Sequence, residues 1–246
     1  MISLDAIFKN PTMLRLYVLH TGDVHMDGNI HMNKKAPGFK KEPEDKRFNP
    51  VYCFLLEHPT KGLCLIDSGL HPDFAQNKTG NFGALVGSLI HVNTRKGMDA
   101  LTQISSLHLN PDDIGSILMT HLHPDHTSGL PLFRRANPIL YIDSKEYRTS
   151  ASAFGVMHGY LRKHWQGFAI RHYAYDLMVP GFTKAADVFE DQSVIILPTP
   201  GHTAGHISIL LNMQGGPVLL TGDAAHRRQN LARQFPTKGD YQQGLA

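Results

Sequence analysis

Side chains that commonly bind metal ions gather in one short stretch of this sequence, residues 120–129. Three imidazoles and a carboxylate fall within six residues there, at His121, His123, Asp125 and His126. Imidazole nitrogen and carboxylate oxygen are ligands that Zn²⁺ takes at about 2.0–2.2 Å, and they also suit other divalent transition metals. A single loop histidine is usually solvated or hydrogen-bonded to the backbone, but burying this many polar groups without a partner is costly. The stretch therefore predicts a metal site.

The apolar run at residues 114–119 has the length and composition of a buried strand, so the ligand candidates lie on the turn that follows it. Side chains in an extended chain alternate in direction, which lets His121 and His123 point together at one ion. Pro124 then breaks the extended conformation. The next two ligand candidates can consequently turn toward a second ion beside the first.

The His-x-His-x-Asp-His pattern resembles the signature of the metallo-β-lactamase superfamily. Three further segments support the resemblance, in the same order along the chain: Leu-Ile-Asp-Ser-Gly at 65–69, Thr-Pro-Gly-His-Thr-Ala-Gly-His at 199–206 and Leu-Leu-Thr-Gly-Asp at 219–223. The resemblance implies a four-layered αββα sandwich. The order of strands and helices alone indicates only an α/β protein with layered sheets.

The resemblance also implies a pair of Zn²⁺ ions in an intact chain, with a ligand set for each. The first ion would be held by His121, His123 and His202, and the second by Asp125, His126 and Asp223, with Asp223 bridging the two. A hydroxide shared by the ions would attack a carbonyl carbon, because coordination lowers the pKa of water to around 7. Asp125 and Asp223 are accordingly expected to act in catalysis, with Asp223 carrying a proton to the leaving alkoxide. Asp67 and His206 are expected to orient the ligands.

Within this superfamily, an imidazole at His123 favours hydrolysis, since members with di-iron redox chemistry usually carry a carboxylate there. The chain looks most like the quorum-quenching N-acyl-homoserine lactone lactonases, which implies lactone ring opening. Those enzymes commonly have a tyrosine three residues after the bridging aspartate, where this chain has His226. An imidazole can also donate a hydrogen bond or bind metal, so His226 is expected to serve as a catalytic residue.

Two other functions remain open from the sequence. A glyoxalase-II-like thiolester hydrolase would need cations for the carboxylates of glutathione, and these could come from Arg134, Arg135, Lys145 and Arg148. An inactive binding or scaffold protein that keeps the fold is the alternative of another class. Superfamily members place a last metal-binding histidine on a late strand, and no histidine follows His226 here. The sequence is therefore expected to lack the last helix and strand, and its second metal site to be weakened.

Composition limits the classes of protein and partner. A chain of 246 residues with 41% apolar content can bury one substantial core, which predicts a single domain over residues 1–246. The net charge of +3 comes without a basic tract, so nucleic acid is not an expected partner. Neither a long apolar run nor a signal peptide is evident, which predicts a cytoplasmic protein that does not bind membranes. We expect a small ester or lactone as substrate, a monomer or homodimer, and buried free thiols at Cys53 and Cys64.

The remaining patterns predict the elements that position the motifs. Strands are predicted at 13–20, 51–56, 63–66, 114–119, 138–143, 194–197, 207–211 and 217–220, with a hairpin joining the second and third. Helical spacing predicts one helix at about 95–108. Residues 21–50, with a charge run at 34–41, and residues 71–94 are expected to be loops. Aromatic residues crowd 144–180, as ordinary packing or as a cap over the site: Tyr147, Phe154, Tyr160, Trp165, Phe168, Tyr173 and Tyr175.

Overall fold

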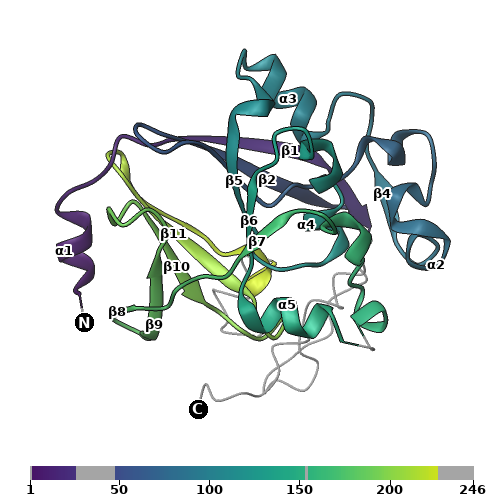
Figure 1. The fold of residues 1–246 in the computed structure, drawn as a ribbon. Helices are drawn as coiled ribbons and strands as arrows, with labels where there is room; N and C mark the ends of the chain where they lie inside the picture. The colour runs from purple at the N-terminus through teal and green to yellow at the C-terminus, as the bar shows by residue number, and fades with distance from the viewer. Residues whose placement is uncertain (1, 26–47, 153–154, 227–246) are drawn as a thin grey trace.

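The computed structural model describes residues 2–25, 48–152 and 155–226, which form two β-sheets that lie against each other (Figure 1). The larger sheet has seven strands in the spatial order β4 (His91–Asn93), β1 (Arg15–His25), β2 (Phe48–His58), β3 (Gly62–Ile66), β5 (Ile114–Leu118), β6 (Ile139–Tyr141) and β7 (Ala169–Arg171). The smaller sheet has five, in the order β12 (Gly216–Leu220), β11 (Ile207–Met213), β10 (Val194–Pro198), β9 (Phe182–Asp187) and β8 (Leu177–Val179). The expected mixed α/β class with layered sheets is confirmed.

The α-helices of the described part are short, with four to seven residues each. They are α1 (Leu4–Phe8), α2 (Gly83–Gly87), α3 (Ala100–Ser106), α4 (Pro124–Thr127) and α5 (Ser144–Ser150). Ile7 of α1 packs against the smaller sheet, and Ile104 of α3 packs against the larger one. None of the described helices is long and apolar enough to span a lipid bilayer.

Alternating side chains divide the core between the two faces of each sheet. In β10, Ile196 packs between the sheets while Ile195 faces α1. In β3, Ile66 packs between the sheets while Leu65 faces the helices on the other side. All four side chains are fully buried, and because a one-residue slip would send each to the opposite face, this alternation fixes the register.

Four strands of the larger sheet run parallel and bring their carboxyl ends to one edge. β3, β5, β6 and β7 are successive parallel neighbours. The segments that follow β3, β5 and β6 therefore emerge side by side, and these carry Asp67, His121 and Asp143. The antiparallel strands β10, β11 and β12 of the smaller sheet present residues 199–206 and 221–226 to the same region. Sheet topology thus gathers motifs that lie far apart in the sequence.

Three predictions about elements differ from the structure, the first because of a local helix cap and the other two because of non-local contacts. The predicted helix at 95–108 is only α3, which begins where Asp99 accepts a hydrogen bond from the backbone N–H of Thr102 at 2.9 Å. The first strand continues to His25, because its last three residues pair with β4. Residues 71–94 are not simply a surface loop, since Phe74 and Phe82 are buried against each other.

The aromatic segment 144–180 supplies core residues and strands to both sheets. β7 completes one edge of the larger sheet and β8 one edge of the smaller. Tyr160 and Trp165 belong to the core beneath the larger sheet, and Tyr173 to the core between the sheets. Ordinary packing therefore accounts for these three side chains. Phe154, the charge run at 34–41 and the expected loss of a last helix and strand fall outside the described residues.

Candidate metal centre

The imidazole of His121 is fully buried at the edge where the parallel strands end. Its Nδ1 lies 3.1 Å from the hydroxyl oxygen of Thr120, which donates its only proton to Asp67 at 2.7 Å. The Thr120 oxygen must therefore accept from His121 Nδ1–H, which leaves a lone pair on Nε2. Within the described part of the chain, this Nε2 has no hydrogen-bond partner. Burial lowers the pKa of His121 well below its usual value, so the ring is neutral, as a metal ligand must be.

Asp67 orients a second imidazole, that of His126. One carboxylate oxygen of Asp67 lies 2.8 Å from His126 Nδ1, and the other accepts from the backbone N–H of Thr120 at 2.8 Å. A carboxylate only accepts, so Nδ1 carries a proton and Nε2 is turned toward Asp223, 3.4 Å from its Oδ1. Burial opposes protonation of this ring, but nearby carboxylates, above all Asp223, raise the pKa of His126 well above its usual value. A position so favourable for a proton also favours a metal cation.

His123 and His202 meet across the two sheets. His123 follows β5 of the larger sheet, His202 follows β10 of the smaller one, and His202 Nε2 lies 2.8 Å from His123 Nδ1. The ring centroid of His121 lies 4.7 Å from that of His123 and 4.8 Å from that of His202. Burial lowers the pKa of both His123 and His202. Three imidazoles therefore converge as neutral donors of nitrogen lone pairs.

Among the residues that the structure describes, candidate ligand atoms form three overlapping groups, and within each group all atoms lie within 4.8 Å of one another. The groups are His121, His123 and His202; His121, His126 and Asp223; and His202, Asp223 and His226. Because His121, His202 and Asp223 each belong to two groups, the groups describe one continuous centre. Imidazoles around a carboxylate offer the nitrogen and oxygen ligand atoms that Zn²⁺ takes. The residues present therefore fit bound divalent metal.

His206 is hydrogen-bonded to the backbone of the turn that carries Asp223. Its Nε2 accepts the backbone N–H of Asp223 at 3.0 Å, so its Nδ1 carries the proton and donates to the hydroxyl of Thr199 at 2.8 Å. Burial lowers the pKa of His206 to about 4, which keeps the ring neutral. Gly222 has a φ of +51° and passes so close to His206 that a Cβ would lie 2.8 Å from Nε2. This packing fixes the turn that carries Asp223.

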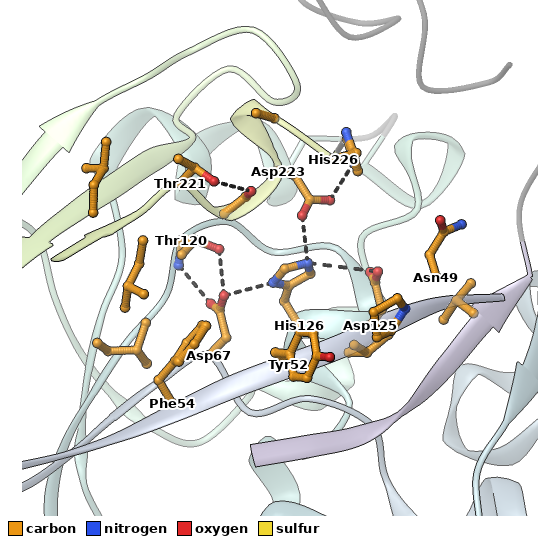
Figure 2. A pocket seen from close by; sticks show the side chains of 18 residues that line it. Asn49, Tyr52, Phe54, Asp67, Thr120, Asp125, His126, Thr221, Asp223 and His226 are labelled. Atoms are coloured by element: carbon orange, nitrogen blue, oxygen red, sulfur yellow. Dashed lines mark hydrogen bonds and ion pairs between the residues drawn. The ribbon is translucent and has the colours of Figure 1, made fainter. Parts of the chain in front are cut away.

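A cavity of about 370 Å³ borders the centre between β2 and β12 (Figure 2). Figure 2 shows Asp223 reaching toward His126 from the smaller sheet, with Asp125 facing the same Nε2 of that imidazole, Asp67 at its Nδ1 and His226 above. All five of these side chains line the cavity. Its volume lies within the range of small-molecule sites, about 300–1,000 Å³. One side of the metal centre is therefore open to a ligand.

The sequence profile of the metallo-beta-lactamase superfamily matches residues 47–243 of this chain. The chain belongs to that superfamily. N-acyl homoserine lactonase AttM of Azorhizobium caulinodans is 30% identical to this chain over 216 residues, which cover 87% of this chain and 78% of AttM. N-acyl homoserine lactonase AiiA of Bacillus thuringiensis subsp. kurstaki is 29% identical over 231 residues, which cover 93% and 82% of the two chains.

Solved structures give the same assignment. An N-acyl homoserine lactone hydrolase with the product N-hexanoyl-L-homoserine at its catalytic metal centre aligns with a TM-score of 0.73 and 25% identity, over 94% of this chain and 83% of that one. A mutant of B. thuringiensis AiiA with N-decanoyl-L-homoserine bound aligns with a TM-score of 0.72 and 25% identity, over the same 94% and 83%. This superfamily member is a metal-dependent hydrolase with the metallo-beta-lactamase fold.

The predicted site residues differ in how closely the structure gathers them. The expected first set, His121, His123 and His202, forms one group. In the expected second set, His126 and Asp223 belong to a group, but Asp125 does not, and its Oδ2 lies 3.8 Å from His126 Nε2. The expected catalytic residue His226 lies 3.0 Å from Asp223. The role of each as a ligand or catalyst stays a prediction.

Sequence reasoning missed Glu146, whose side chain supports the centre, and named Tyr160 only among the aromatic residues of a possible cap. Glu146 is buried and accepts hydrogen bonds from both histidine-bearing loops. The ring of Tyr160 lies 5.6 Å from that of His123. A signal for Glu146 was present, because Asp143-Ser-Lys-Glu146 has the form of a helix capping box directly after a predicted strand. That pattern would have placed Glu146 at the ligand-bearing edge.

Proposed function

We propose that this protein is a zinc-dependent hydrolase that opens the lactone ring of N-acyl-homoserine lactones. The single observation that carries the proposal is the convergence of imidazoles and a carboxylate around His121, in groups whose ligand atoms lie within 4.8 Å of one another, with no hydrogen-bond partner for the Nε2 of His121 among the described residues. Similarity to N-acyl homoserine lactonases over most of the chain supports the substrate class.

The proposed residue roles follow from the contacts. His121, His123 and His202 would hold one zinc ion, and Asp125, His126 and Asp223 the second. Zinc bound there would supply an acidified water as nucleophile and would polarise the lactone carbonyl. The Asp67 carboxylate accepts a hydrogen bond from His126 Nδ1–H. The lone pair of Nε2 is therefore the one that would bind the metal ion. Asp223 and His226, 3.0 Å apart, can hold a proton between Oδ2 and Nε2 and release it to the leaving alkoxide.

The thiolester alternative loses part of its proposed cationic pocket. Arg134 donates to the backbone carbonyls of Gln166 and Lys163 and lies over the ring of Phe168. Arg135 forms an ion pair with Asp112 at 2.8 Å. Asp112 precedes β5, whereas the metal centre lies after the other end of that strand. These two cations are engaged away from the centre, so the geometry favours the lactone.

A substrate panel tests the proposal. The zinc-loaded protein is assayed with acyl-homoserine lactones, a glutathione thiolester and nitrocefin, and again after chelation. We expect turnover of the lactones only, lost on chelation and restored by Zn²⁺. Turnover of the thiolester instead would favour the glyoxalase-II-like alternative, and turnover of none would favour an inactive scaffold.

Matched variants test the assignment of residues. Asp125→Ala and Asp223→Ala are expected to abolish lactone turnover. His206→Ala is expected to weaken it by about 10- to 100-fold, the usual effect of removing a group that orients a ligand. Glu57→Gln, on β2 and paired with Arg15, is the control and should retain full turnover. Equal activity of Asp223→Ala and the control would refute the role of Asp223.

A further inference from the structure

Glu146 is a buried carboxylate between the two histidine-bearing loops, with only 1% of its surface exposed. Its Oε1 accepts the backbone N–H of Leu122 at 3.0 Å, and its Oε2 accepts the backbone N–H of Gly205 at 3.0 Å. Leu122 lies between His121 and His123, and Gly205 follows His202 closely. One side chain therefore joins the loop of the larger sheet to the loop of the smaller one.

Glu146 is itself held in place at the start of α5. Asp143 caps this helix by accepting the backbone N–H groups of Lys145 and Glu146 at 2.7 and 3.1 Å. Asp143 is fixed in turn by the hydroxyl of Tyr175, which donates to it at 2.7 Å. The loop of Gly205 lies so close to this helix start that no Cβ would fit between them. The carboxylate is thus a rigid support rather than a mobile side chain.

Tyr160 links the same carboxylate to the imidazole of His123. The two rings lie 5.6 Å apart and are inclined by 33°. Burial, followed by the charge of Glu146 and a hydrogen bond to it, raises the pKa of the Tyr160 phenol, so the hydroxyl stays protonated. The neutral phenol therefore adds no second charge beside Glu146, while its ring contacts His123.

We propose that Glu146 is a positioning residue, which sets the distance between His121 and His123 on one loop and His202 on the other, and thereby the affinity of this site for metal. The inference rests on the metal centre of the proposed function, but not on the lactone substrate. The base of the two loops is joined separately by the backbone bond from Ile207 N–H to the carbonyl of Thr120 at 3.0 Å. Loss of Glu146 therefore frees the loop tips while the sheets stay in register.

Replacement by glutamine separates the bridging role from the volume of the side chain. An amide offers one acceptor oxygen, while its nitrogen only donates. Glu146→Gln can thus accept from Leu122 or from Gly205, but its nitrogen then faces the other backbone N–H as donor against donor. Glu146→Asp keeps both oxygens but is one methylene shorter, so it too reaches only one loop. Glu57→Gln is the matched control, since Glu57 binds Arg15 and Tyr17 on the larger sheet.

The test measures binding of Co²⁺ alone to the full chain, by titration and by the visible absorption of the bound ion. We expect Glu146→Gln to bind Co²⁺ about 10- to 100-fold more weakly than the wild type, with an altered absorption spectrum, and Glu57→Gln to match the wild type. Glu146→Asp should show a smaller loss. Urea unfolding of the metal-free chains is measured in parallel, because a purely structural role would lower stability and leave the affinity and spectrum of the folded chain unchanged.

The outcomes separate this inference from the proposed function. Wild-type affinity and spectrum in Glu146→Gln would overturn the positioning role, whatever happens to stability. If Glu146→Gln does not fold, wild-type affinity and spectrum in Glu146→Asp would overturn it equally. A wild-type chain that binds no Co²⁺ would overturn the metal centre and the role of Glu146 together. Weakened binding in the variants supports the inference even if no lactone is hydrolysed.

Discussion

Mild acid should destabilise this protein in part through a buried imidazole outside the metal centre, that of His164. The residue is 1% exposed, its Nε2 donates to the carbonyl of Asn81 at 3.2 Å, and its Nδ1 lies 2.8 Å from the hydroxyl of Thr127. Burial lowers the pKa of His164 to about 4 from an ordinary value of 6.5. Because the unfolded chain then binds the proton more readily than the folded one, the contribution to stability is fully present above pH 6.5 and is lost as the pH falls from 6.5 to about 4.

The size of the effect follows from the two pKa values of His164. A difference of one pKa unit is worth 1.36 kcal/mol, so the full loss between 6.5 and about 4 is roughly 3 kcal/mol. Between pH 7 and pH 5 the same two values give a loss of about 2 kcal/mol. A domain is typically stable by only about 5–15 kcal/mol, so this loss is readily measured.

Urea unfolding at pH 7 and pH 5, followed by the fluorescence of the single tryptophan, Trp165, measures this loss. A chelator is present throughout, so that competition between protons and metal does not contribute. His164→Gln should lose about 2 kcal/mol less than the wild type on acidification, because its side chain takes up no proton. His108→Gln, an exposed control after α3, should behave as the wild type. An equal pH dependence in His164→Gln and the wild type would refute the reasoning.

Three further predictions concern the packing around the metal centre and the thiols. Gly205→Ala should lower the free energy of unfolding by about 1–3 kcal/mol, because its Cβ would clash with the backbone of Glu146. Gly215→Ala is the control, since Gly215 has open space around it, and should leave the free energy of unfolding unchanged. Urea unfolding compares the two variants. Asp67→Asn should lower the affinity for Zn²⁺ by about 10- to 100-fold in a competition titration, since an amide nitrogen can face His126 Nδ1–H only as a second donor. Unchanged affinity would contradict the role of Asp67 in orienting the His126 ring. Burial raises the pKa of Cys64 to about 12, so the native thiol should not react with a disulfide reagent at pH 8, and rapid native labelling would contradict its burial.

The sequence predicted those parts of the fold that depend on local patterns. Strands such as β5 and β10 are short apolar runs between turn residues, and the metal motif follows β5 directly. The extension of β1 to His25 could not be predicted, because it depends on pairing with β4, far along the chain. The predicted helix before β5 was too long, since helical spacing continues across the turn that precedes the Asp99 cap.

The candidate site was predictable where the ligands lie within motifs. His121, His123 and His202 were each placed by a local pattern, and only the fold could show that they converge. Glu146 belongs to none of these motifs. Its two hydrogen-bond partners lie 24 and 59 residues away, so its role depends on how β6 lies in the sheet. Contacts at such separations are not encoded in any short window of sequence.

The cavity between β2 and β12 makes the two ends of the metal centre unequal in their contact with solvent. His121 is fully buried, whereas the side chains of Asp223 and His226 line the cavity and keep 19% and 13% of their surface exposed. An ion held beside Asp223 and His226 borders this cavity, which gives water and competing chelators a direct route, whereas none of the three imidazoles His121, His123 and His202 lines it. We therefore expect the two positions to exchange their ions at different rates, so that brief dialysis against a weak chelator would leave a chain carrying a single, slowly released metal.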